Sequence, residues 1–123
     1  MAKPNDTVMQ HCTSPLHVGE IEGADAIGFA DLDGRAPRVS FYIKVQSDRL
    51  TEIRYQTFGC GFMIACCSIL ADMLQRRTLQ ECLATTAEDL EQAAGGLPPQ
   101  KKFCADLAIK SIHHAVTQLE VVE

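Results

Sequence analysis

Hydrophobic and polar residues alternate along two neighbouring stretches in the first half of the chain. Val39, Phe41 and Ile43 are separated by more polar residues, and positions 53 to 57 alternate in the same way. A period of two is typical of strands that bury one face. Because the residues at 46–49 favour a turn, these two strands are predicted to form an antiparallel hairpin. Ala26 to Leu32 is predicted to supply a further strand.

Most of the remaining chain has helical patterns. The stretch from Phe62 to Leu74 is apolar on almost every face at its start, which is typical of a buried helix. Thr78 and Thr86 are suitable N-caps for two short helices, and residues 5–12 can form a short opening helix with Asn5 or Asp6 as its cap. The final helix has an apolar stripe formed by Cys104, Ala108, Ile112, Ala115 and Leu119. Its outer face is expected to contain Lys102, Asp106, Lys110, Ser111, His114 and Gln118.

The order of these elements predicts the fold class. Strands first and helices afterwards indicate an α+β fold, with a small antiparallel three-stranded sheet packed on one face by helices. The length of 123 residues suits a single domain, residues 1–123, with one hydrophobic core. Hydrophobic residues make up 46% of the chain and charged residues 22%, which is the profile of an ordinary globular protein.

Charge and hydrophobicity argue against two classes of partner. The formal net charge is −5 and there is no basic stripe, so a nucleic-acid partner is not expected. The longest apolar stretch, at 58–71, is shorter than the roughly 20 residues that cross a bilayer, so no membrane association is expected. The first residues lack the apolar core of a secretory signal, which predicts a cytoplasmic location where the cysteines remain thiols.

Two cysteines lie where a helix is predicted to begin. Cys60 lies between a strand and the buried helix, and Cys104 follows a proline- and lysine-rich entrance to the last helix. Free backbone N–H groups and the helix dipole at such positions favour thiolate over thiol, and therefore metal ligation or nucleophilic attack. The alternative is that both residues belong to the core, since buried thiols pack as small hydrophobes.

The remaining cysteines have no comparable setting. They are Cys12, Cys66, Cys67 and Cys82. The adjacent pair in the buried helix lies about 9 Å along the axis from position 60, and this pair and Cys82 are interpreted as core residues. The group His11, Cys12 and His17 matches no standard zinc spacing and is predicted to lie in a surface loop. No acid pair or Ser/His/Asp arrangement stands out, so the chain is not expected to be an enzyme.

Several segments together resemble the NifU/IscU family of iron–sulfur cluster scaffolds. The similar segments are the TFGCG turn at Thr57–Gly61, the LPPQK stretch at 97–101 and the IKV strand at 43–45. The resemblance extends from about His11 to the last helix. It implies the α+β fold predicted above and a site at which Cys60 and Cys104 meet.

The chain departs from the family at three positions of that site. Arg35 stands where the resemblance implies the first cluster cysteine, Pro37 where it implies an aspartate, and Phe103 where it implies a histidine. A guanidinium cannot be deprotonated in a protein and so cannot bind iron. Arg35 is therefore interpreted either as a solvated loop residue or as a cation that stabilises thiolates, a persulfide or a cluster. Phe103 and Lys101 are further accessory candidates.

The resemblance implies a scaffold-like protein that binds iron or a labile cluster of the 2Fe–2S type through Cys60 and Cys104. Because such a cluster takes four ligands, the others are expected from a second chain in a homodimer, a small thiol or a partner. Zinc is a weaker alternative. Two other functions stay open, namely an adaptor that has lost the metal site and an acceptor of persulfide sulfur.

The resemblance also implies partners. They are a cysteine desulfurase, an Hsp70/J-type chaperone and apo recipients of clusters. The chaperone is expected to grip the proline-stiffened segment Leu97, Pro98, Pro99, Gln100 and Lys101. The alternative is that this segment merely starts a helix, since proline at a helix entrance needs no partner to explain it.

Overall fold

The sheet has three antiparallel strands in chain order. In this computed structural model, which describes residues 5–120, the strands are β1 (Ala26–Leu32), β2 (Arg35–Gln46) and β3 (Arg49–Phe58). The β2–β3 pairing places Ile43 opposite Ile53, and the register shifts once, between Lys44 and Val45. The predicted hairpin, the third strand and the α+β class are confirmed.

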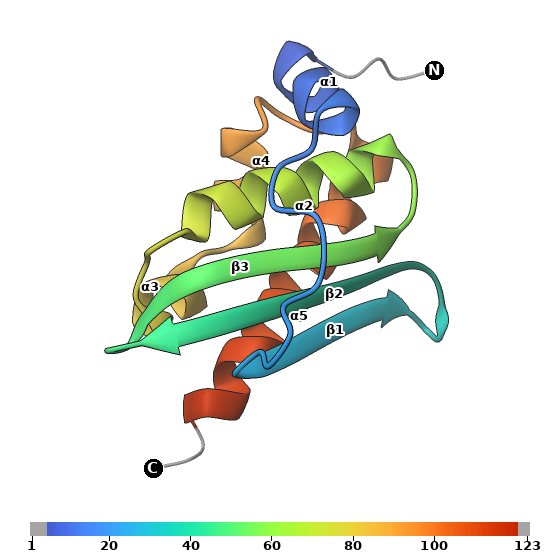
Figure 1. The fold of residues 1–123 in the computed structure, drawn as a ribbon. Helices are drawn as coiled ribbons and strands as arrows, with labels where there is room; N and C mark the ends of the chain where they lie inside the picture. Colours follow the sequence, from blue (N-terminus) through green and yellow to red (C-terminus); the bar gives the residue numbers. More distant parts are fainter. Residues whose placement is uncertain (1–4, 121–123) are drawn as a thin grey trace.

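Helices cover one face of this sheet. They are α1 (Asp6–Thr13), α2 (Gly61–Leu74), α3 (Leu79–Ala84), α4 (Ala87–Ala93), the short 3-10 turn η1 (Pro99–Lys101) and α5 (Lys102–Glu120). Figure 1 shows α2 and α5 against the face of the sheet that is turned away from the viewer. Thr78 and Thr86 are the N-caps of α3 and α4 as predicted, and each forms a capping box.

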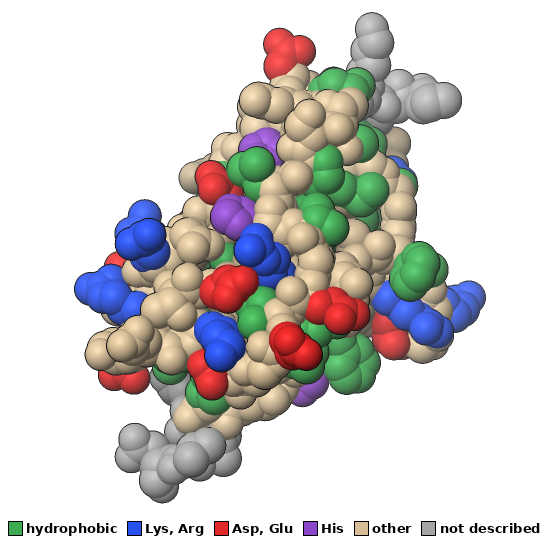
Figure 2. All heavy atoms as spheres, viewed as in Figure 1, with side chains coloured by type: hydrophobic (Ala, Val, Ile, Leu, Met, Phe, Trp, Pro, Cys, Tyr) green, Lys and Arg blue, Asp and Glu red, His purple; other side chains and the backbone are tan. Residues whose placement is uncertain are grey.

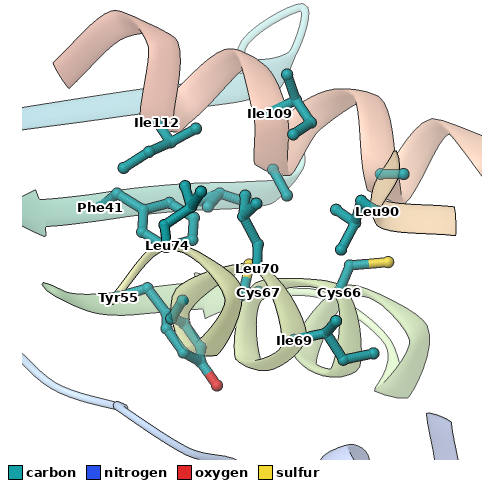
Figure 3. Close-up of a cluster of buried hydrophobic side chains, with 14 of the residues drawn as sticks. Phe41, Tyr55, Cys66, Cys67, Ile69, Leu70, Leu74, Leu90, Ile109 and Ile112 are labelled. Atoms are coloured by element: carbon teal, nitrogen blue, oxygen red, sulfur yellow. The ribbon is translucent and has the colours of Figure 1, made fainter. Parts of the chain in front are cut away.

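The core lies between the sheet and the two long helices. Figure 3 shows Leu70 and Cys67 of α2 directed toward α5 and Phe41 of β2. Cys66, Cys67 and Cys82 are completely buried, so their interpretation as core residues is confirmed. Burial raises the pKa of all three thiols, that of Cys82 to about 11, which keeps them protonated at neutral pH.

Helix α5 approaches β1 closely because Gly28 has no side chain. A Cβ at Gly28 would collide with the backbone of Ser111 and Ala115. The expectation that Ser111 lies on the outer face of this helix is wrong, since its side chain is fully buried. The Ser111 hydroxyl donates a hydrogen bond of 3.0 Å to the Gly28 carbonyl. The helical pattern of the sequence does not indicate that α5 lies this close to β1.

Helix α1 packs across α2, and polar contacts hold it there. Asn5 caps α1 at Val8 N–H and also donates to the Ala94 carbonyl at 2.9 Å. The buried Ser68 hydroxyl accepts from Leu16 N–H at 2.9 Å and pairs with His11 Nδ1 at 2.7 Å. The predicted opening helix with Asn5 as its cap is confirmed. The prediction of a surface loop is therefore wrong for His11 and Cys12, which lie in the last turn of α1 against α2, whereas His17 does lie in the loop that follows.

Candidate functional site

The two cysteines predicted to meet come together at one end of the sheet. Cys60 is the N-cap of α2 at the end of β3, and Cys104 lies in the first turn of α5. The two thiols lie near enough that the Cys60 sulfur helps to raise the pKa of Cys104. The start of β2 lies next to Gly59, the residue before Cys60. A Cβ on Gly59 would be only 3.0 Å from Pro37 Cβ of β2.

Cys60 is the accessible member of the pair. Its side chain is exposed, and Lys101 Nζ lies 3.4 Å from its Sγ atom. Partial burial opposes ionisation, but the backbone N–H groups of Met63 and Phe62 and the Lys101 ammonium together hold the pKa of Cys60 below its ordinary value. The sulfur makes no side-chain capping hydrogen bond to α2. The start of the helix nevertheless favours the thiolate of Cys60, as the sequence predicts.

Cys104 has the opposite character. It is completely buried, and burial together with the neighbouring Cys60 sulfur raises the pKa of Cys104 to about 12, against the lowering effect of Lys101. The expectation that the helix start favours thiolate at this residue is wrong, because desolvation outweighs the dipole. The site therefore contains one exposed thiol of lowered pKa and one buried thiol that stays protonated at neutral pH.

The accessory residues occupy different places around the pair. Lys101 is the cation in contact with Cys60, and its ammonium also lies 5.7 Å from the centre of the Phe62 ring. Arg35 is exposed at the start of β2 and is not among the groups that shift the pKa of either thiol. Phe103 is partly buried and packs against the hydrophobic core.

The segment from Leu97 to Lys101 is only partly exposed. Leu97 is buried in the core, so it is not available to the chaperone that is expected to grip this segment. Pro99 and Gln100 are exposed, and Pro98 and Lys101 are half-buried. Pro99 opens the short turn η1 that leads directly into α5. The segment therefore connects Leu97, which is buried in the core, to Lys101, which contacts Cys60.

Two further features of this end of the molecule were not found from the sequence. Cys12 Sγ lies against the first residue of α2, since a Cβ built on Gly61 would be 2.6 Å from it. Phe58, two residues before Cys60, is 75% exposed. Figure 2 shows hydrophobic side chains gathered on the visible face toward the end that carries α1. The proximity of Cys12 has no sequence signal, because it depends on how α1 packs on α2.

The side chains set limits on what this site holds alone. Within residues 5–120, no three or more His, Cys, Asp or Glu side chains are grouped so as to hold a metal ion. The pair Cys60 and Cys104 offers two sulfur donors, which suits a soft metal that takes further ligands from elsewhere. None of the helices in the described part of the chain has the length and hydrophobicity that a bilayer crossing requires.

This fold and site define a class of small α+β proteins with a paired-cysteine site at the ends of two helices. The model of the NifU-like N-terminal domain matches residues 3–122 of the sequence. The chain therefore belongs to the NifU N-terminal domain family.

Known relatives agree with this assignment. One of two iron–sulfur cluster assembly scaffold proteins IscU of Archaeoglobus fulgidus is 37% identical over 112 residues, which cover 91% of this chain and 73% of the relative. The corresponding protein of Aquifex aeolicus is 35% identical over 114 residues, with the same two coverages. The N-terminal domain of a NifU-like protein from Brucella abortus has the same fold, with a TM-score of 0.77 at 13% identity over 97% of this chain and 95% of that one.

Proposed function

We propose that this chain is an iron–sulfur cluster assembly scaffold that holds iron or a labile cluster through Cys60 and Cys104. The observation that carries the proposal is the proximity of an exposed thiol of lowered pKa to a second thiol whose pKa it helps to raise, where β3 ends and α2 and α5 begin. Thiolates are the usual protein ligands of such clusters. The scaffold names of the relatives support the same function.

Two donors are too few for a tight site within one chain. A 2Fe–2S cluster takes four ligands, so two chains that each present Cys60 and Cys104 would complete the set. A partner protein or a small thiol would do the same. Mononuclear zinc is a weaker candidate, because structural zinc sites use four protein ligands. Weak, shared ligation suits a protein whose cargo has to leave.

Anaerobic reconstitution with ferrous iron and sulfide tests the proposal. The wild-type protein is expected to develop thiolate-to-iron charge-transfer absorption, and Cys60→Ser and Cys104→Ser are expected to lose it. Cys82→Ala is the matched control, since it removes a buried thiol from α3. A wild-type protein that stays colourless and binds no iron would refute the proposal.

A second candidate is an adaptor that keeps the fold and docking surfaces without the metal. Arg35, Pro37 and Phe103 favour it, because none of them supplies a metal ligand at the three positions where the family resemblance implies one. The partners would be a cysteine desulfurase, an Hsp70/J-type chaperone and apo recipient proteins. Pulldown experiments with the desulfurase and the chaperone test this candidate, and binding to neither would remove its support.

A third candidate is the acceptance of persulfide sulfur by Cys60 or Cys104. The lowered pKa of Cys60 favours it, because the thiolate is the form that attacks sulfur. Soon after the protein is mixed with a cysteine desulfurase and its substrate, mass spectrometry is expected to find one added sulfur on Cys60. A protein that carries no added sulfur at any time would count against sulfur transfer and leave iron binding as a separate question.

The segment Leu97–Lys101 is the proposed chaperone-binding surface. Its exposed residues, Pro99 and Gln100, lie next to the lysine that contacts Cys60. Proline reduces the conformational entropy that a segment loses when a partner binds it. Binding measurements with Gln100→Glu test this surface, since the negative charge added to the exposed part of the segment should weaken chaperone binding while iron binding is retained.

A further inference from the structure

Cys12 lies beside the proposed site without a role in it. Its sulfur is 2.6 Å, and its Cβ 3.8 Å, from a Cβ built on Gly61, the residue that follows Cys60. Because neighbouring Cα atoms are about 3.8 Å apart, Cys12 Sγ is at most about 8 Å from Cys60 Cα. A side chain on Gly61 would fill the place that the Cys12 sulfur occupies.

The position of Cys12 is held by contacts along α1. Asn5 ties the start of α1 to the Ala94 carbonyl at 2.9 Å. Near the end of the helix, His11 Nδ1 pairs with Ser68 Oγ of α2 at 2.7 Å, and Leu16 N–H donates to the same oxygen at 2.9 Å. The packing of α1 on α2 therefore places Cys12 at the N-terminus of α2 in the folded protein.

Accessibility separates Cys12 from the other cysteines. Cys60 is exposed and Cys12 is half-buried, whereas the other four cysteines are buried. Thiol–disulfide exchange requires an attacking thiolate with access to the sulfur that it attacks. Of the thiols near Cys60, Cys12 is partly exposed to solvent, although its side chain also packs against the edge of the core. Cys104 is near Cys60 but fully buried.

We propose that Cys12 is a resolving thiol that discharges a persulfide from Cys60. The Cys12 sulfur attacks the inner sulfur of the Cys60 persulfide, forms a Cys12–Cys60 disulfide and breaks the bond to the outer sulfur. The outer sulfur takes the electron pair and the proton lost by Cys12, and leaves as hydrosulfide. Sulfur at the oxidation level of a persulfide is thereby reduced to sulfide, the form that a cluster contains, and the two cysteines are oxidised.

The 3.8 Å from Cys12 Cβ to the position of a Cβ on Gly61 puts the Cα atoms of Cys12 and Cys60 at most about 11 Å apart. Cysteines joined by a disulfide have Cα atoms about 4.4–6.8 Å apart, so formation of the bond requires the last turn of α1 to lie or to move within that range of Cys60. An external dithiol of the thioredoxin class would return the disulfide to two thiols. This inference rests on the proposed function in one respect, that Cys60 receives sulfur at the site.

The first experiment follows the discharge directly. The full-length protein is loaded anaerobically with glutathione persulfide, freed of reagent, and followed by intact-mass spectrometry and a sulfide assay. Wild-type protein is expected to lose its added sulfur, release one sulfide per chain and gain a disulfide that peptide mapping assigns to Cys12–Cys60. Cys12→Ser and Cys12→Ala are expected to keep the persulfide, whereas Cys82→Ala should behave as wild type.

Gly61→Ala provides a second variant that retains every thiol. Its Cβ would stand 2.6 Å from Cys12 Sγ and displace that sulfur, so discharge is expected to slow while the persulfide still forms on Cys60. Discharge at the wild-type rate in Cys12→Ser, or a disulfide mapped to Cys60–Cys104, would overturn the proposal.

Oxidation of the sulfur-free protein separates this inference from the proposed function. Diamide treatment of the folded protein is expected to join Cys12 to Cys60, whether or not the protein accepts sulfur. If no such disulfide forms, the resolving role is refuted. Cys12→Ser is expected to bind iron as wild type does, because Cys12 is not a proposed ligand. If neither protein binds iron, the scaffold function is refuted, while the disulfide result still decides the resolving role.

Discussion

Replacement of Lys101 by glutamine tests the electrostatics of the Cys60 thiol. The ammonium lies 3.4 Å from the sulfur and acts together with the backbone N–H groups of Met63 and Phe62 to lower the pKa of Cys60. Because Cys60 is exposed, water screens the contact, and pairs of this kind contribute roughly 0.2–1 kcal/mol. The upper end of that range corresponds to about a fivefold change in the ratio of thiolate to thiol.

The reaction rate of Cys60 with a disulfide reagent measures this change. Removal of the positive charge raises the pKa of Cys60, so less thiolate is present at neutral pH. The remaining thiolate is a better nucleophile, which offsets nearly half of the effect and leaves a net fall of about two- to threefold. The midpoint of the rate–pH profile is expected to move to higher pH in Lys101→Gln, with peptide mapping used to follow Cys60 alone.

Lys102→Gln is the matched control for this experiment. It removes the same charge one residue later, but Lys102 Nζ lies 3.7 Å from Glu91 Oε1 and not at the thiol. Its rate–pH profile is expected to stay close to that of wild type. The difference between the two variants should shrink at high salt, since exposed charges are screened. Equal slowing in both variants, or an unmoved profile in Lys101→Gln, would refute a specific contact.

Three further substitutions test how the fold supports the site. Gly28→Ala is expected to lower the free energy of unfolding by about 1–3 kcal/mol, because its Cβ collides with the backbone of Ala115; wild-type stability in urea would contradict the close helix approach. Asn5→Ala removes the cap of Val8 N–H and should cost about 1 kcal/mol, measured by thermal unfolding. Thr78→Ala loses one capping box and should cost a similar amount, with an unchanged melting temperature as the adverse result.

Much of the fold could be predicted because its local patterns agree with its tertiary packing. The predicted strand at Ala26–Leu32 has the bounds of β1, and the predicted helix ends at Leu74, where α2 ends. Their burial follows the period of the sequence. Ser111 was misplaced because its burial depends on Gly28, a residue distant in the sequence that lets α5 approach the sheet. Such a close contact leaves no mark in the periodicity of either segment.

The site was predictable in its members more than in its electrostatics. The predicted helix starts single out Cys60 and Cys104, and the family resemblance implies that they lie together; the Cys60 thiol is near enough to help raise the pKa of Cys104. Their protonation differs because Cys104 is sealed in the core, which a helix-start rule does not report. Arg35 and Lys101 are both accessory candidates from the sequence, and of the two it is Lys101 in η1 that contacts the thiol, whereas Arg35 is exposed.

The unequal protonation of the two thiols has a consequence for how the proposed site takes up iron. The pKa of Cys104 is about 12, so this residue is a thiol at neutral pH, and ligation of a metal has to displace its proton. Release of one proton makes the apparent affinity rise about tenfold for each unit of increasing pH. Because the pKa of Cys60 is lowered, this residue adds less to the pH dependence of iron binding near neutral pH. Iron binding to wild type should therefore strengthen with rising pH, and Cys104→Ser should lose most of this dependence together with affinity. A pH dependence that is the same in both proteins would show that Cys104 is not a ligand.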